Sequence, residues 1–124
     1  MSPRLYIDCD DTLVLWHDAT DDERGYDLNA PLIADINCFL DHHKDYDLWV
    51  WSGGGAKYAL RWAIECFGET GEWKATAKDL KAVHPGDIVV DDMISEFVAV
   101  PGALYLAPDQ LTRCPLCAVP LTAH

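Results

Sequence analysis

Two pairs of acidic residues follow short apolar runs at distant places in the chain. Asp8 and Asp10 come directly after the run at residues 4–7, and Asp91 and Asp92 follow a second run near the other end. A carboxylate can attack phosphorus and form an acyl-phosphate, which divides a difficult hydrolysis into two easier displacements. Asp8 is the predicted nucleophile. A carboxyl two residues later can protonate the leaving alkoxide and then take a proton from water, so Asp10 is the predicted general acid and base.

The same carboxylates predict a magnesium site. An anionic nucleophile repels an anionic phosphate, and a hard cation with oxygen ligands neutralises that repulsion. The predicted Mg²⁺ ligands are Asp8, Asp10 through its backbone carbonyl, and Asp91. Asp92 is expected to bind through water or to hold the other ligands in place. Mg²⁺ is therefore the predicted cofactor.

A phosphate-binding group is predicted where Ser52 is followed by three glycines and the start of a helix. Ser52 supplies a hydroxyl, Gly53 an exposed amide, and the helix a positive end, all of which favour phosphoryl oxygens. A lysine should complete this group. Lys78, shortly before the second acidic pair, is the predicted lysine, and Lys74 and Lys81 are the alternatives.

The elements that position these residues follow from the apolar pattern. Short apolar runs predict strands, the central ones buried on both faces, at residues 4–8, 47–52, 73–77, 88–92 and 103–107. Apolar residues at helical spacing predict a helix over 31–43, capped by Asn29, and another over 56–67, ended by Gly68. Alternating strands and helices indicate a parallel sheet in a three-layer, Rossmann-like α/β fold.

In such sheets ligands bind outside the carboxyl ends of the strands. Asp8, Ser52 and Asp91 each fall at such an end, which predicts that the three side chains meet.

The whole chain, residues 1–124, is predicted to form one domain. Residues 14–29 include a polar stretch without a clear period and are expected to form a short, flap-like excursion over the strand ends. Residues 108–124 are expected to form a C-terminal tail. We expect no separate cap domain.

The run at residues 5–13 resembles the first motif of the haloacid-dehalogenase superfamily, a hydrophobic strand followed by the pattern DxDxT. Residues 49–53 are similar to the second motif, a strand that ends in Ser or Thr. Lys78 matches the third motif, and residues 87–92 resemble the fourth, a strand that ends in paired Asp. The resemblance extends over about residues 4–107.

This resemblance implies a Rossmann-like fold, an aspartyl-phosphate intermediate and Mg²⁺. It implies the roles given above for Asp8, Asp10, Ser52, Lys78 and Asp91. The acid at Asp10 is a feature of the phosphatases in this superfamily, so the resemblance implies phosphatase rather than dehalogenase activity.

Without a cap domain, the site sets no limit on the size of the substrate. We expect a nucleotide or another small phosphomonoester, and Trp16 and Tyr26 are candidates to stack on its base or sugar. A polynucleotide-end or phosphoprotein phosphatase is the alternative enzyme, and a second subunit of a homo-oligomer could cover the site. A catalytically silent binding or assembly module is the alternative outside enzymes, which the intact carboxylates disfavour.

The composition of the chain disfavours some partners and locations. The formal net charge of −12 and a sequence pI near 4.5 disfavour nucleic acid as a general partner. Apolar runs are too short to cross a membrane, and residues 1–6 lack the pattern of a signal peptide. We therefore expect a cytoplasmic protein without a membrane partner.

Five cysteines at irregular spacing do not indicate a disulfide framework. Cys114 and Cys117 have the two-residue gap that suits tetrahedral zinc. A lone pair is half of such a site, with His84, His124 or a cysteine from a second copy as candidates for the missing ligands. The pair therefore predicts either a structural Zn²⁺ site or a plain or redox-sensitive thiol pair.

Overall fold

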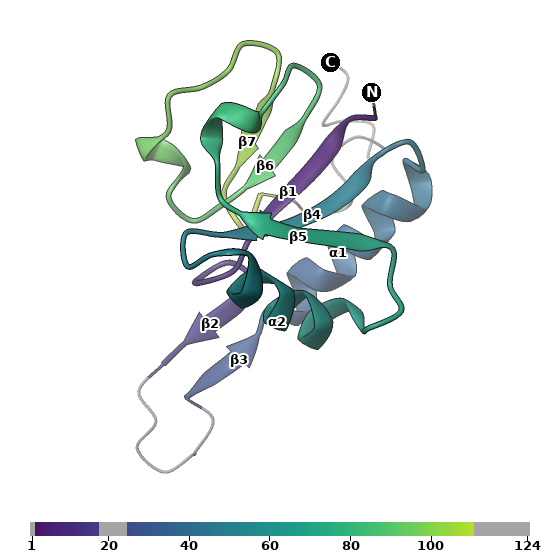
Figure 1. The fold of residues 1–124 in the computed structure, drawn as a ribbon, viewed down its shortest axis with the longest axis vertical. Coiled ribbons are helices and arrows are strands. Elements are labelled where there is room, and N and C mark those ends of the chain that lie inside the picture. The colour runs from purple at the N-terminus through teal and green to yellow at the C-terminus, as the bar shows by residue number, and fades with distance from the viewer. Residues whose placement is uncertain (1, 18–24, 111–124) are drawn as a thin grey trace.

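The computed structural model describes residues 2–17 and 25–110, and these residues form an α/β fold with one five-stranded parallel sheet (Figure 1). The helices and strands are, in chain order, β1 (Arg4–Asp8), β2 (Val14–Trp16), β3 (Tyr26–Leu28), α1 (Ala30–His42), β4 (Asp47–Ser52), α2 (Ala56–Phe67), β5 (Trp73–Ala77), β6 (Ile88–Val90) and β7 (Leu104–Leu106). Two short 3₁₀ helices, η1 (Leu80–Ala82) and η2 (Ile94–Glu96), lie in the connections that follow β5 and β6.

The strand order is β5-β4-β1-β6-β7, with β1 in the centre. Ile7 of β1 pairs with Val50 on one side and with Val90 on the other, and all pairings within this five-stranded sheet are parallel. Because β1 is covered on both faces, Leu5, Tyr6 and Ile7 are all buried. The carboxyl ends of β1, β4 and β6 therefore meet at one edge of the sheet.

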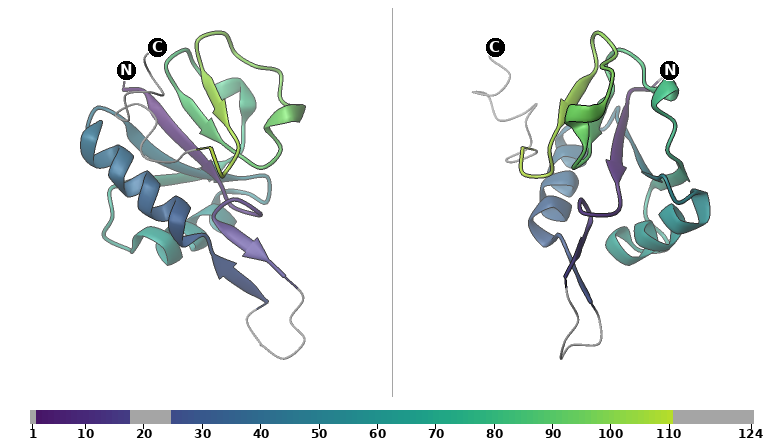
Figure 2. Two further views of the ribbon diagram at one scale, coloured as in Figure 1. Left: turned by 180° about the vertical axis from the view of Figure 1, so that it is seen from behind. Right: turned by 90° about the vertical axis from the view of Figure 1, so that its left-hand side faces the viewer.

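The chain moves outward from β1 in both directions. The crossovers from β1 to β4 and from β4 to β5 contain α1 and α2, whereas the connections that follow β5 and β6 lead to the other half of the sheet (Figure 2). The point where the strand order reverses, beside β1, is where α/β sheets bind ligands.

The two α-helices share one hydrophobic core with one face of the sheet. That cluster is made of buried side chains of α1, α2 and the central strands, among them Leu32, Ile36, Phe39, Ala59, Trp62, Ala63, Leu5, Ile7, Leu48 and Val50. The opposite face is covered by side chains from the connections instead, since Val83, Phe97 and Val100 pack there with Tyr6, Trp51 and Val89. In the described ranges this second covering layer contains 3₁₀ turns and no α-helix.

Local sequence explains where the helices begin and end. The Asn29 side chain accepts a hydrogen bond from the Leu32 amide at 3.3 Å, and proline occupies the first turn of α1, as predicted. The N-cap of α2 is Gly55, whose φ of +106° is a conformation that only glycine adopts without strain. Gly68 ends α2, also as predicted.

The described parts of this segment, residues 14–17 and 25–29, are more regular than the predicted excursion. Val14 pairs with Leu28 and Trp16 with Tyr26 in an antiparallel two-stranded hairpin that extends from the carboxyl edge of the main sheet (Figure 1). The Asn29 side chain donates to the Thr12 carbonyl at 2.9 Å, which fixes the base of the hairpin. A three-residue strand is too short to show a clear period in the sequence.

The predicted strands at residues 4–8, 47–52 and 73–77 and the predicted helix at 56–67 have the observed bounds, and the other elements differ by one or two residues at an end. In the part of the chain that the structure describes, no helix combines the length and the apolar character needed to cross a membrane. The tail predicted for residues 108–124 lies largely outside the described residues.

Candidate active site

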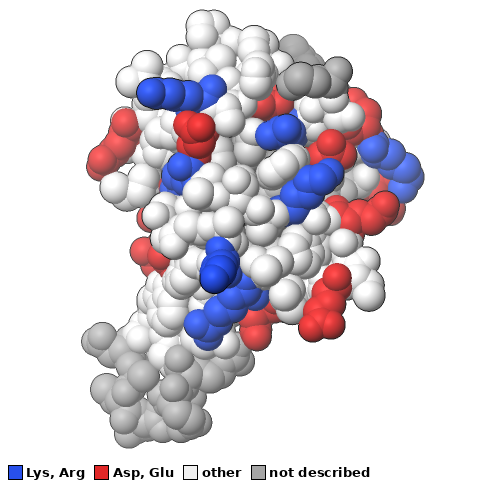
Figure 3. Space-filling view, in the orientation of Figure 1, with Lys and Arg blue, Asp and Glu red and all other residues white. Residues whose placement is uncertain are grey.

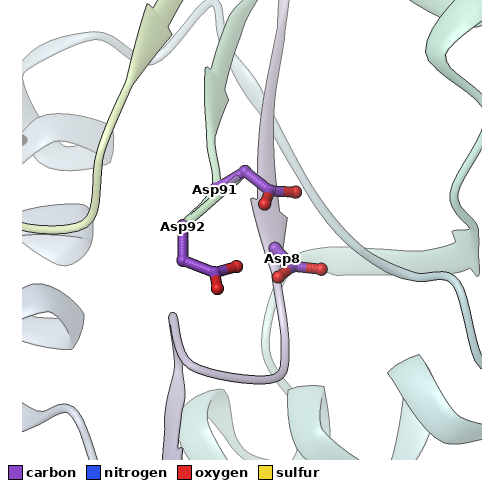
Figure 4. Close-up of side chains that lie close together, drawn as sticks. All are labelled: Asp8, Asp91 and Asp92. Carbon is purple, nitrogen blue, oxygen red and sulfur yellow. The ribbon is translucent and has the colours of Figure 1, made fainter. Parts of the chain in front are cut away.

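Three carboxylates lie close together beyond the carboxyl ends of β1 and β6 (Figure 4). Asp8, Asp91 and Asp92 each offer an oxygen atom, and these oxygens lie within 4.8 Å of one another. Asp91 is completely buried and Asp8 is 6% exposed, whereas Asp92 faces solvent. The parallel pairing of β1 with β6 brings these residues together although about eighty positions separate them in the sequence.

Lys78 lies between the two buried carboxylates. Its Nζ is 2.9 Å from Asp8 Oδ1 and 2.6 Å from Asp91 Oδ2. The lysine is placed there from β5, because its backbone amide donates to the Ser52 carbonyl at 2.9 Å. Three carboxylates and one ammonium group give the cluster a formal net charge of −2.

Burial and the neighbouring charges shift the pKa values of the groups in this site. Burial raises the pKa of Asp8 to about 6, the charge of Asp91 adds to the rise, and the hydrogen bond from Lys78 opposes it. Burial, followed by the neighbouring Asp91, also raises the pKa of Asp92. Burial alone would lower the pKa of Lys78, but its hydrogen bonds to Asp91 and Asp8 outweigh that effect and raise it. Additional positive charge at this position would therefore be stabilising.

A tight turn carries the chain out of β1. The Cys9 carbonyl accepts from the amides of Thr12, Leu13 and Val14 at 3.0–3.2 Å, and Asp11 adopts a φ of +60°. Asp tolerates this left-handed conformation better than most residues do. The turn buries Thr12, whose hydroxyl donates to Asp8 Oδ2 at 3.4 Å.

Cys9 lies between Asp8 and Asp10 in the sequence but has no part in the cluster. Its side chain is buried, and Sγ donates to the Trp51 carbonyl at 3.5 Å. Burial raises the pKa of Cys9 to about 12, so the thiol is protonated and a weak nucleophile at neutral pH.

The Asp10 side chain lies outside the three-carboxylate cluster, at an exposed position. Its Oδ1 accepts a hydrogen bond from the Tyr58 hydroxyl at 2.5 Å and another from the Trp16 indole at 3.0 Å. The predicted metal ligand at this residue is the backbone carbonyl of Asp10, and these hydrogen bonds of the side chain do not involve that carbonyl. Tyr58 has no sequence signal of its own, since tyrosine in an amphipathic helix is equally typical of a core position.

Ser52 ends β4 and is 3% exposed. Its Oγ accepts from the Gly54 amide at 2.9 Å, which leaves the hydroxyl proton available to another acceptor. Its carbonyl accepts from the Gly55 and Lys78 amides, so the glycine loop and Lys78 are held to the same strand end. Gly53, the residue predicted to supply an amide, is exposed.

The structure distinguishes the three candidate lysines. Lys78 contacts Asp8 and Asp91. The Lys74 ammonium instead lies 5.6 Å from the centre of the Trp49 ring, and Lys81 is an exposed residue of η1. The structure therefore brings Asp8, Asp91, Asp92 and Lys78 together, with Ser52 attached to Lys78 through the backbone.

Cys114 and Cys117 lie outside the described residues, as does His124, so the zinc prediction stays a prediction. Comparisons of this chain with protein-family models, with curated proteins and with solved structures find no match.

Proposed function

We propose that this protein is a Mg²⁺-dependent phosphomonoester hydrolase that forms an aspartyl-phosphate on Asp8. The observation that carries the proposal is the cluster of Asp8, Asp91 and Asp92, whose oxygens lie within 4.8 Å of one another and whose charge Lys78 balances only in part. Structural carboxylates at strand ends are usually solvated or paired, and burying several of them together is costly. A function that needs concentrated negative charge accounts for that cost.

The donor set fits a divalent cation. Magnesium prefers carboxylate, carbonyl and water oxygens and usually keeps several waters, which suits a site with one exposed edge at Asp92. Asp8, Asp91 and Asp92 would hold the ion, with the Asp10 carbonyl as a further ligand. When bound, Mg²⁺ neutralises the formal charge of −2 and polarises phosphoryl oxygens.

The side chains then have separate tasks. The Asp8 carboxylate attacks phosphorus while Lys78 holds a phosphoryl oxygen, and the Ser52 hydroxyl and the Gly53 amide donate to the others. Asp10 gives a proton to the leaving oxygen and later takes one from the water that releases phosphate from Asp8.

The proposed family is the haloacid-dehalogenase superfamily. The central β1 ending in the DxDxT pattern, the β4 end at Ser52 and the β6 end at Asp91 support this assignment, since the sheet topology brings these motifs to one edge. We propose that its three-layer arrangement is reduced here, with 3₁₀ turns in place of helices on one face. A cytoplasmic location belongs to the same proposal.

The proposed substrate is a nucleotide or another small phosphomonoester. A second candidate, a phosphorylated polynucleotide end, is favoured by a groove of about 450 Å³ beside β5 that Lys57 and Lys74 line together with Trp49 and Trp73. Figure 3 shows Lys and Arg side chains over the region of β5 and α2, with Asp and Glu side chains among them. Aromatic rings and cations together suit single-stranded nucleic acid.

Phosphate release from a panel of nucleotides, sugar phosphates and a 3′-phosphorylated oligonucleotide tests the proposal. Release should require Mg²⁺, stop with EDTA, and disappear in Asp8→Asn, because a carboxamide of the same shape cannot attack phosphorus. Release that persists in Asp8→Asn would exclude the covalent mechanism. No release from any substrate would favour the silent binding module instead.

A further inference from the structure

The Asp10 carboxyl group is held by donors from two separate elements. The hydroxyl of Tyr58, in the first turn of α2, donates to Asp10 Oδ1 at 2.5 Å, and the indole Nε1 of Trp16, in β2, donates to the same oxygen at 3.0 Å. Two donors on one carboxylate oxygen make that oxygen a poor place for a proton. The other oxygen, Oδ2, is therefore the one suited to carry it.

The two donors are supported by the same buried residue. Trp62 is completely buried in α2, and its ring lies edge-on to those of Trp16 and Tyr58, at centroid distances of 5.9 and 6.3 Å. Tyr58 also packs beside the glycine loop, since a Cβ atom built on Gly54 would lie 3.4 Å from the Tyr58 ring. The donors are thus tied to the hydrophobic core and to the loop that follows Ser52.

We propose that Tyr58 and Trp16 are positioning residues that fix the Asp10 carboxyl group so that Oδ2 delivers and recovers the proton of the reaction. The inference rests on the proposed function. In the first displacement the bond from Asp8 to phosphorus forms, the bond to the leaving oxygen breaks, and the proton on Oδ2 moves to that oxygen. In the second, Oδ2 takes a proton from water, the water oxygen bonds to phosphorus, and the bond to Asp8 breaks.

The test uses leaving groups that differ in their need for a proton. A 4-nitrophenolate leaves without protonation, whereas the alkoxide of an alkyl phosphomonoester needs it. We therefore compare the first turnover of 4-nitrophenyl phosphate with that of the best alkyl substrate, in Tyr58→Phe and in Trp16→Phe. Tyr58→Phe should slow the first turnover of the alkyl ester by about 10-fold, which is less than the roughly 10²- to 10⁴-fold rate increase that an acid catalyst provides. The same substitution should change the first turnover of the aryl ester by less than about twofold. Trp16→Phe should show the same selectivity with a smaller loss.

Two further variants sharpen the test. Tyr46→Phe removes a phenol hydroxyl at the opposite end of the sheet, where it donates to the Gly86 carbonyl, and should leave both rates unchanged. The double variant Tyr58→Phe/Asp10→Asn should be no slower than Asp10→Asn, because Tyr58 acts only through Asp10.

Equal slowing of both substrates by Tyr58→Phe, or additive effects in the double variant, would overturn the positioning role while leaving the phosphatase assignment intact. Absence of any Asp8-dependent turnover in the unmodified protein would instead overturn the proposed function, and the inference with it.

Discussion

Lys78 is the residue on which the charge balance of the site depends. It contacts the two buried carboxylates at 2.9 and 2.6 Å, and its side chain is 21% exposed. Removing one partner of a buried ionic group leaves the remaining charges uncompensated.

Lys78→Met should therefore destabilise the metal-free protein by about 3 kcal/mol and lower turnover by roughly 10²-fold or more, as loss of a charge-stabilising donor does. Urea unfolding with and without Mg²⁺ measures the change in the free energy of unfolding, and Mg²⁺ should restore part of the lost stability. Lys81→Met, on the exposed 3₁₀ helix η1, is the matched control and should behave like the unmodified protein. Equal effects of the two substitutions would contradict the assigned role of Lys78.

Asp8 gives a prediction about pH. Its pKa is about 6 in the folded protein and near 3.8 in the unfolded chain, so the folded state binds a proton more tightly. The stabilising contribution of that proton is complete below pH 3.8 and is lost as the pH rises through 6. It amounts to up to about 3 kcal/mol at 1.36 kcal/mol for each pKa unit.

The free energy of unfolding of the metal-free protein should accordingly decrease between about pH 4 and pH 6 relative to that of Asp8→Asn, which has no such group. Urea titrations of both proteins across this range, in EDTA, measure the difference. A constant difference over the whole range would mean that Asp8 is not held in a costly ionised state.

At the scale of single elements, the start of α2 depends on Gly55. Its φ of +106° is strained for any other residue, whereas Gly53 is exposed, has open space at its Cβ position and no such φ. Gly55→Ala should lower the free energy of unfolding by about 1–3 kcal/mol, and Gly53→Ala should change it little. Thermal and urea unfolding of the pair measure this, and similar stabilities for both variants would contradict the conformational argument.

The sequence predicts most of these elements because strands such as β1 and β4 are buried apolar runs with a polar end, and because Asn29 and Gly68 mark helix ends. It did not predict the β2–β3 hairpin, since three-residue strands leave no clear period. The cluster of Asp8, Asp91 and Lys78 follows from strand ends in a parallel sheet. The hydrogen bonds from Tyr58 and Trp16 to Asp10 do not follow from the sequence, because only packing of α2 against the hairpin brings the two donors to one oxygen.

For the whole molecule, metal binding should be visible as stability. A ligand that binds only the folded state stabilises it by about 2.7 kcal/mol at a concentration one hundred times its dissociation constant. Saturating Mg²⁺ should thus raise the thermal midpoint of the unmodified protein, and the midpoint of Asp91→Asn should respond much less. An equal rise in the two proteins would place the effect of Mg²⁺ elsewhere than at the cluster of Asp8, Asp91 and Asp92.

Phosphorylation of Asp8 is the step that defines the proposed mechanism, and it changes the mass of the protein. The protein is mixed with its best substrate and Mg²⁺, quenched in acid during the first turnover and digested, and the peptides are weighed. We expect one added phosphoryl group on the peptide that contains Asp8, and none when EDTA is present or when Asp8 is replaced by Asn. Turnover without a phosphorylated Asp8, together with an active Asp8→Asn variant, would contradict the proposed mechanism.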